Sequence, residues 1–298
     1  MKHKRYSTRA VRARRLFVGC TSVVVLLIAV RGSANGADER DLDAPGTNVE
    51  HAVVERAPLD PPEQTPASED AVLLRDKPAP AAVLRAFLDA WQEDKAEDTK
   101  EIAELKRFLK SGDVDAFEGA ERLVGALRRR YEAFDAGVKA FYEDRIEKAV
   151  PLFRRSVSAP DEWLAAHAAY FAARASIVEE DYESALPLLR RVAGEWRERT
   201  LFSGEALFLI GVSRAQLLDR SGAARVFTHF LERYPDAPER MRIAARQQSI
   251  ELATLESGSM PDVEAHMEAS RRRLALLRTD DATQDTQGRI LAMLDRLI

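Results

Sequence analysis

The sequence has one cysteine, Cys20, among 298 residues. A single thiol can form neither an intrachain disulfide nor a multi-cysteine metal site. The five histidines include no HExxH motif and no other pair spaced four residues apart, which is the spacing that places two ligands on one helix face. The fourteen glycines are scattered and form no phosphate-binding loop, and no Gly-x-Ser-x-Gly elbow is present. These absences predict a protein that is not an enzyme, with no catalytic residues, no cofactor and no metal site.

Residues 1–31 lack acidic side chains entirely and contain eight lysines and arginines. A basic stretch, an apolar run over 16–30 and small residues over 32–37 follow in the order of an export signal. As a helix the apolar run is about 22 Å long, shorter than the roughly 30 Å hydrocarbon core of a bilayer. We therefore predict a signal peptide over 1–34, with an uncleaved signal anchor as the alternative. In both cases the body is exported, and is either periplasmic or anchored to the inner membrane facing the periplasm.

The rest of the chain has the opposite charge balance. Residues 32–298 hold 37 basic and 49 acidic residues, a net charge of −12. An acidic body repels polyanions, so we predict no nucleic-acid partner. Residues 35–80 contain seven of the thirteen prolines and no apolar period, a composition that cannot bury enough surface to order the chain. This range is predicted to be a disordered linker.

Beyond residue 80 the sequence has no alternating strand pattern, and its apolar spacing is helical nearly throughout, which predicts an all-α fold. Apolar stripes over 83–91 and 102–109 predict N-terminal helices within 81–129. From Phe117 to Phe141 the apolar residues step by three and four, which is the pattern of a heptad seam. We expect one helix here, packed on two sides. The same seam could instead mediate self-association.

Residues 149–157 read AVPLFRRSV, and residues 185–193 read ALPLLRRVA, 36 residues later. Self-similarity at such a period is typical of stacked-repeat proteins, which present surfaces to partners. A small residue also precedes an alanine by twelve positions, and a large apolar residue follows that alanine by four. This pattern occurs three times, in Gly137, Ala149 and Phe153; in Ala173, Ala185 and Leu189; and in Gly211, Ala223 and Phe227.

This spacing resembles the tetratricopeptide repeat family over residues 130–256. The resemblance implies an α-solenoid of about three helix pairs, flanked by the N-terminal helices and by C-terminal capping helices over 257–298. The last unit, LLDRSGAARVFTHFLERYPDAPE, resembles repeats of bacterial periplasmic proteins involved in outer-membrane assembly and envelope constriction. Two features depart from the family: the periods of 36 and 38 exceed the usual 34, and Arg214 replaces an apolar or aromatic residue.

In the resembled family, ligands lie along one side of the first helices of the pairs. Mapped onto this chain, that side is an aromatic and apolar groove with one arginine, which suits a hydrophobic helix or peptide. Large apolar stripes are more often buried than exposed, so an N-terminal helix, 83–91 or 102–109, could fill the groove instead. The candidate partner-binding residues are Tyr131, Phe134, His167, Tyr170, Arg174 and Phe208.

The sequence thus predicts an exported, non-enzymatic scaffold or adaptor for a protein or peptide partner in the cell envelope. It would touch the membrane only through its N-terminal segment. One alternative is a membrane-tethered structural protein that self-associates as a homo-oligomer through residues 117–141. Another is an accessory subunit of an envelope enzyme, which predicts a polar pocket with convergent carboxylates or histidines.

Overall fold

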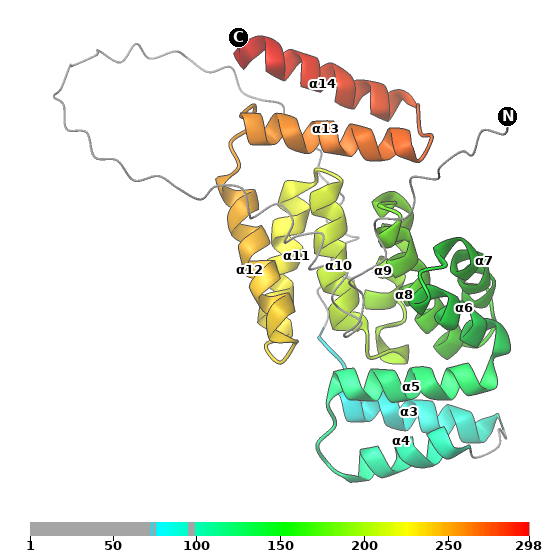
Figure 1. Ribbon diagram of the computed structural model, residues 1–298. Coiled ribbons are helices and arrows are strands. Elements are labelled where there is room, and N and C mark those ends of the chain that lie inside the picture. Colours follow the sequence, from blue (N-terminus) through cyan, green and yellow to red (C-terminus); the bar gives the residue numbers. More distant parts are fainter. Residues whose placement is uncertain (1–72, 74–75, 95–98, 298) are drawn as a thin grey trace, which may run out of the picture. The chain divides into compact units, whose positions relative to one another are not determined.

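The structure, a computed structural model, describes residues 73, 76–94 and 99–297. Within these residues the chain is all-α, as predicted: it has twelve α-helices, α3 to α14, one short 3-10 helix, η1, and no strand (Figure 1). The export signal over 1–34 and most of the predicted linker lie outside the described residues. None of the described helices combines the length and the apolar character needed to cross a bilayer.

The first three helices form a group in which each contacts the other two. The stripes predicted over 83–91 and 102–109 lie on the buried faces of the first two helices, where Leu84, Ile102 and Leu105 are fully enclosed. Thr99 and Asp115 cap the second and third helices by accepting backbone N–H groups through their side chains. The three helices are α3 (Pro80–Glu93), α4 (Lys100–Lys110) and α5 (Ala116–Arg130).

The stretch from Phe117 to Phe141 is two helices, so the prediction of one continuous helix is wrong. The break falls at Tyr131, whose backbone is extended (φ −119°, ψ 98°). Three arginines end the helix before it, and two acidic residues lie in the first turn of the helix after it. These charges favour a helix end followed by a helix start. Basic side chains stabilise the negative C-terminal end of one helix dipole, and acidic side chains stabilise the positive N-terminal end of the next. Arg128 also pairs with Asp135 across the break at 2.8 Å.

Most of the seam residues on both sides of this break are core. Leu127, Phe134 and Val138 have no exposed surface, and Val124 and Phe141 are nearly as buried. Their three-and-four spacing reflects burial against neighbouring helices of the same chain. These five residues are therefore packed inside the chain, whereas Phe117 and Tyr131 of the same seam keep part of their surface exposed.

Residues 132–254 form a series in which each helix packs against the next (Figure 1). The last helix of the series also contacts α10. The series comprises the pairs α6 (Glu132–Tyr142) and α7 (Ile146–Val157), α8 (Glu162–Val178) and α9 (Tyr182–Ala193), and α10 (Ser203–Gln216) and α11 (Arg220–Arg233), followed by α12 (Glu239–Thr254).

The turn inside each pair has the same backbone geometry. Asp144, Glu180 and Leu218 are left-handed, with φ of 57°, 59° and 67°. In each turn the next residue's N–H donates to the carbonyl oxygen five positions earlier, at 2.8–2.9 Å, which is the Schellman arrangement. The turns lie 36 and 38 residues apart, so the period read from the sequence is also a period of the backbone.

The small residues of the repeat pattern lie where two helices of a pair approach most closely. A Cβ added to Gly137 would lie 2.8 Å from Phe153, and one added to Gly211 would lie 2.6 Å from Phe227. Both aromatic rings are fully buried. The spacing from each glycine to its aromatic residue therefore reflects an aromatic ring of the second helix packed directly on the backbone of the first.

A short segment before α3 is held against α11. Leu73 is buried, Lys77 pairs with Asp236 at 2.6 Å, and Asp76 pairs with Arg233. The ammonium of Lys77 also lies 5.6 Å from the centroid of the Tyr234 ring. These residues lie within the range predicted to be a disordered linker.

The last two helices, α13 (Met260–Ala275) and α14 (Asp281–Leu297), pack against each other as a hairpin. The turn between them repeats the geometry of the three earlier turns. Leu277 is left-handed (φ 59°), and the N–H of Arg278 donates to the carbonyl of Arg273 at 2.9 Å.

Replacing Leu277 by glycine is expected to raise the free energy of unfolding by about 0.5–1 kcal/mol, because a Cβ disfavours the left-handed conformation. The Leu277 side chain is 88 % exposed, so its removal sacrifices little packing. Thermal or urea unfolding of Leu277→Gly measures the gain. Leu277→Ala is the control, because it keeps the Cβ. An equal gain in both variants would show that backbone strain is not the cause.

Candidate functional site

Five of the six residues predicted to form a partner-binding groove are buried within the helical body. They share their environment with aromatic rings of neighbouring elements. The five, with their exposed fractions, are Phe134 (0 %), His167 (0 %), Tyr170 (0 %), Phe208 (2 %) and Arg174 (6 %).

The connection between α9 and α10 fills much of this region. It spans residues 194–202 and contains η1 (Arg197–Arg199). Phe202, its last residue, stacks on Tyr170 with ring centroids 4.0 Å apart and meets the ring of His167 edge-on at 5.6 Å. The structure thus differs from both expectations at His167 and Tyr170: both side chains are buried, and the segment packed on them is this connection rather than an N-terminal helix.

The remaining predicted residues pack within and between the helix pairs. Phe134 contacts the rings of Phe153 and Phe171, at centroid distances of 6.1 Å and 5.9 Å. The Arg174 guanidinium lies 5.0 Å from the Phe141 ring centroid. Phe208 contacts the rings of Phe227 and Phe230. These residues stabilise the body rather than line its surface.

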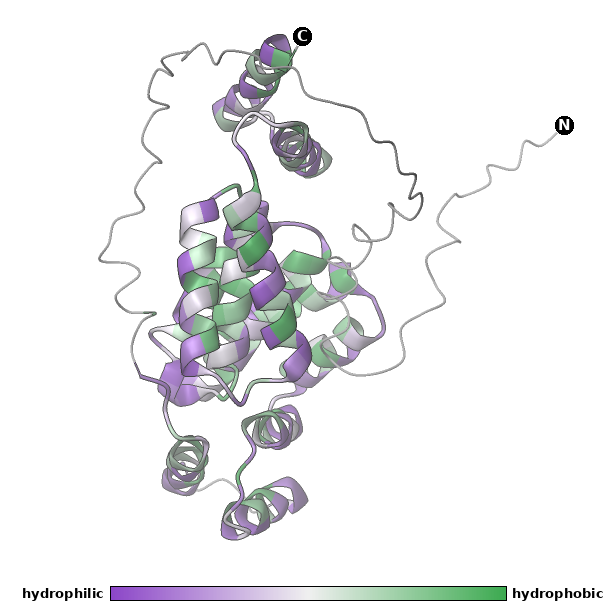
Figure 2. Cartoon of the chain, turned by 90° about the vertical axis from the view of Figure 1, so that its left-hand side faces the viewer, coloured by the Kyte–Doolittle hydropathy of each residue, from purple (hydrophilic) through white to green (hydrophobic). Residues whose placement is uncertain are grey.

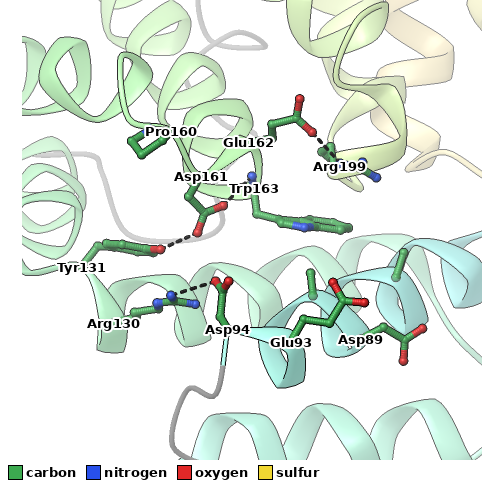
Figure 3. Close-up of a pocket in the computed structure, with 12 residues that line it drawn as sticks. Asp89, Glu93, Asp94, Arg130, Tyr131, Pro160, Asp161, Glu162, Trp163 and Arg199 are labelled. Atoms are coloured by element: carbon green, nitrogen blue, oxygen red, sulfur yellow. Dashed lines mark hydrogen bonds and ion pairs between the residues drawn. The ribbon is translucent and has the colours of Figure 1, made fainter.

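Tyr131 is the member of the set that lines an open cleft (Figure 3). The cleft has a volume of about 730 Å³ and lies between the end of α3, the α5–α6 break and the start of α8. Arg199 of η1 closes one side. We take this cleft as the candidate functional site, because it brings a predicted residue together with charged groups from four separate elements.

Tyr131 and Asp161 form the polar centre of the cleft. The Tyr131 hydroxyl donates to one carboxylate oxygen of Asp161, and the other oxygen accepts the backbone N–H groups of Trp163 (2.8 Å) and Leu164 (3.2 Å). Asp161 is therefore the N-cap of α8, and its position fixes the phenol. Burial of the phenol, together with its hydrogen bond to Asp161, raises the pKa of Tyr131 well above its usual value.

The two arginines of the cleft already have partners. Arg130 pairs with Asp94 at 2.9 Å and lies 5.0 Å from the Trp91 ring centroid. Arg199 pairs with Glu162 at 2.9 Å, with its guanidinium 5.5 Å from the Trp163 ring (Figure 3). Each arginine is oriented by a carboxylate and an aromatic face, so the positive charge of each is already balanced by a carboxylate of the cleft wall.

Two carboxylates of the cleft have no ion-pair partner in the described part of the chain. Asp89 and Glu93 lie one helical turn apart on α3, and both are exposed. With Asp94, Asp161 and Glu162, the lining carries five carboxylates against two guanidinium groups. The cleft therefore attracts cationic groups, and its α3 wall can pair with them without breaking an existing contact.

A second cleft, of about 920 Å³, lies between the α13–α14 hairpin and the turns that follow α8 and α10. Three of its arginines are paired across this boundary: Arg220 with Asp262, and both Arg273 and Arg278 with Glu183. These charges hold the hairpin in place. Across the described ranges, no group of three or more histidine, cysteine, aspartate or glutamate side chains is placed to hold a metal ion.

Sequence reasoning missed the residues that make the cleft, apart from Tyr131. Asp161 had a detectable signal, because an aspartate directly before a helical apolar pattern is a typical N-cap. Asp89 and Glu93 had none, since a pair of acidic residues on a helix is usually a solvated face. Phe202 lies in a connection without periodicity, so its packing on Tyr170 depends on tertiary structure alone.

Tyr131→Phe is expected to lower the free energy of unfolding by about 1 kcal/mol, because it removes the hydrogen bond to Asp161. Asp161→Ala is expected to cost more, about 2 kcal/mol, since it removes the helix cap as well. Urea unfolding of both variants measures the difference. Equal costs for the two variants would mean that the cap contributes nothing beyond the phenol contact.

Comparison with known proteins gives no match, either to a protein-family model or to a curated protein. The likeness to the tetratricopeptide repeat family is a resemblance of residue spacing in the sequence.

Proposed function

We propose that this protein is an exported, non-enzymatic adaptor whose tetratricopeptide-like helix pairs form an α-solenoid and bind a partner protein in the cell envelope. The observation that carries this proposal is the threefold turn at Asp144, Glu180 and Leu218, with the same hydrogen bonds at the sequence period. Repeated helix pairs of this kind stack into extended surfaces that bind other proteins. The close packing of Gly137 and Gly211 on aromatic rings supports the same architecture.

The partner would bind in the cleft beside Tyr131 rather than along the buried residues. Asp89 and Glu93 are exposed and free to pair with cationic side chains, while the neighbouring arginines are fixed by carboxylates. The cleft therefore suits a polypeptide segment with lysine or arginine side chains one helical turn apart. Such pairing contributes orientation and association rate more than raw affinity.

Placement in the envelope rests on residues 1–34, whose basic and apolar order is that of an export signal or anchor. The body would be periplasmic, or held at the inner membrane by that segment alone. The acidic body gives no reason to expect a nucleic-acid partner.

The accessory-subunit alternative receives less support from the same cleft. It needs convergent carboxylates that are free to act on a substrate. Asp161 is committed to the cap of α8, and Asp94 and Glu162 are committed to arginines. The two uncommitted carboxylates suit binding of a cation better than acid–base chemistry.

Partner capture from the native envelope tests the proposal. The double variant Asp89→Lys, Glu93→Lys is expected to lose partners that the wild-type chain retains, because it reverses the charge of the α3 wall. The matched control reverses two exposed acidic residues elsewhere, Glu121→Lys and Glu147→Lys, and is expected to keep them. Identical partner sets for the two double variants would refute the cleft as the binding site.

A further inference from the structure

The exposed large apolar residues gather at the C-terminal end of the chain. Nine such side chains are exposed in the described residues, and six of them belong to the α13–α14 hairpin and its turn. Figure 2 shows hydrophobic (green) stretches among hydrophilic (purple) ones along the two helices of this hairpin, next to the C-terminus. A soluble surface rarely collects apolar residues in this way unless something covers them. The six are Met260, Met267, Leu274, Leu277, Leu291 and Leu297.

Three of these residues form one line along α13. Met260, Met267 and Leu274 are spaced by seven, and their exposed fractions are 61 %, 54 % and 43 %. A spacing of seven places residues on the same face of a helix over successive double turns. We call this line the α13 stripe.

The opposite side of α13 already packs against the rest of the body. Asp262 is buried and pairs with Arg220, and Arg272 is buried and donates to the carbonyl oxygen of Gln216 at 2.6 Å. Val263, which lies one turn before Met267 at the edge of the stripe, is buried as well. The helix is therefore fixed by one face, and the α13 stripe is left open on another.

One acidic and one basic residue lie beside the stripe, on either side of its centre at Met267. Glu264 and Arg271 flank Met267, three residues before it and four after it, on the same side of the stripe. In a heptad with the stripe at position a, both residues fall at position e. Antiparallel helices bring e positions together, so Glu264 of one copy would face Arg271 of the other, twice per pair.

We infer that the α13 stripe is a homotypic docking surface, on which a second copy of this chain packs antiparallel about a twofold axis at Met267. Met260 of each copy then lies opposite Leu274 of the other, which makes the surface complementary to itself. Parallel pairing would instead bring e positions to g positions. It would place Arg271 of one copy beside His266 of the other rather than beside a carboxylate, so the charges favour the antiparallel arrangement.

Glu264 strengthens this choice of occupant. It is exposed and forms no ion pair within the described part of its own chain, whereas Arg271 pairs with Glu180 and Glu268 at 2.7 Å and 2.5 Å. A guanidinium has five N–H donors, so Arg271 can donate hydrogen bonds to a further carboxylate. In the antiparallel pair, Arg271 of the second copy supplies the cationic partner that Glu264 lacks within the described part of its own chain.

Disulfide cross-linking of the full-length chain tests the surface. In a Cys20→Ser background, mild oxidation of Met267→Cys is expected to give a covalent dimer, because the twofold axis brings the two positions together. Ala275→Cys, equally exposed on the same helix, is the control. It is expected to stay monomeric, because its two copies would lie about 24 Å apart along the pair, beyond disulfide reach.

A mixture of two single-cysteine proteins tests the register. Met260→Cys and Leu274→Cys are each expected to give no homodimer, since like positions lie about 21 Å apart in the antiparallel pair. Mixed together, they are expected to give the heterodimer. The proposal would be overturned if Met260→Cys and Leu274→Cys each formed a homodimer. It would also be overturned if neither their mixture nor Met267→Cys formed a cross-link.

The charge pattern is tested by Glu264→Arg, which places two arginines opposite each other at both ends of the pair. The dissociation constant of the dimer is expected to rise about tenfold. Adding Arg271→Glu to the same chain is expected to restore it, because the pairs are then reversed. No weakening by Glu264→Arg would contradict the antiparallel register. These measurements do not involve the cleft, so their outcome is independent of the proposed adaptor function.

Discussion

Acidification from pH 7.5 to pH 4 is expected to lower the free energy of unfolding by about 3 kcal/mol through His167 alone. His167 is fully buried in α8, and burial lowers its pKa from the usual 6.5 to about 4. Its Nδ1–H donates to the carbonyl oxygen of Trp163 at 2.8 Å, while Nε2 has no hydrogen-bond partner among the described residues. Protonation would place a second, unpaired N–H and a charge in this site.

The direction of the effect follows from the two pKa values. Between pH 6.5 and pH 4 the unfolded chain protonates His167 while the folded chain does not. The unfolded state therefore binds more protons, and stability rises with pH across this window. The contribution is fully present above pH 6.5 and is lost as the pH falls towards 4.

His167→Leu removes this dependence, because leucine does not titrate. Urea unfolding of wild type and variant between pH 4 and pH 7.5 measures the slopes, whatever the variant's absolute stability. His229, whose pKa burial also lowers, titrates in both proteins and so cancels in the comparison. Parallel curves for the two proteins would show that His167 is not buried in its neutral form.

Gly211→Ala is expected to lower the free energy of unfolding by about 2 kcal/mol, because its Cβ would overlap the buried ring of Phe227. This cost outweighs the gain of about 1 kcal/mol that alanine normally brings to a helix interior. The same substitution at Gly137 meets the Phe153 ring at 2.8 Å and is expected to act in the same direction.

Gly125→Ala is the matched control. Gly125 lies inside α5, and an added Cβ would meet no atom within 4 Å. It is therefore expected to raise the free energy of unfolding by about 0.5–1 kcal/mol. Urea unfolding of the variants compares the two signs. A stabilising Gly211→Ala would mean that the two helices of the third pair do not pack as described.

Local rules in the sequence predicted the helices and the spacing of their turns. The all-α fold follows from apolar periodicity. The sequence repeat at an offset of 36 residues corresponds to the left-handed turn residues Asp144 and Glu180, which lie 36 residues apart. The pattern of small and large residues reappears as Phe153 packed on Gly137. These features are recoverable because each depends on residues close in the chain or repeated at a fixed period.

Features set by tertiary packing were not recoverable. The heptad pattern around Tyr131 has the same period in a broken helix as in a continuous one, so the period could not reveal the break. The predicted groove was placed by analogy with the repeat family, and nothing in its residues shows that Phe202 packs on His167 and Tyr170. Of the cleft, Tyr131 was identified, whereas the unpaired state of Asp89 and Glu93 depends on what lies opposite α3.

The cleft and the α13 stripe lie on different helices, and different variants test them. A chain that binds a basic segment at α3 and a second copy at α13 would present two partner sites per dimer. Two sites on one dimer raise the apparent affinity for a partner that carries repeated basic segments.

Photo-cross-linking in the native envelope tests the adaptor role most directly. A photoreactive side chain at Ala90, which lines the cleft on α3, is compared with one at Ala253, an exposed position on α12. We predict that Ala90 captures a protein other than a second copy, that Ala253 does not, and that Asp89→Lys with Glu93→Lys abolishes the adduct. No adduct at Ala90, or the same adducts at both positions, would contradict the proposal that this cleft binds a partner.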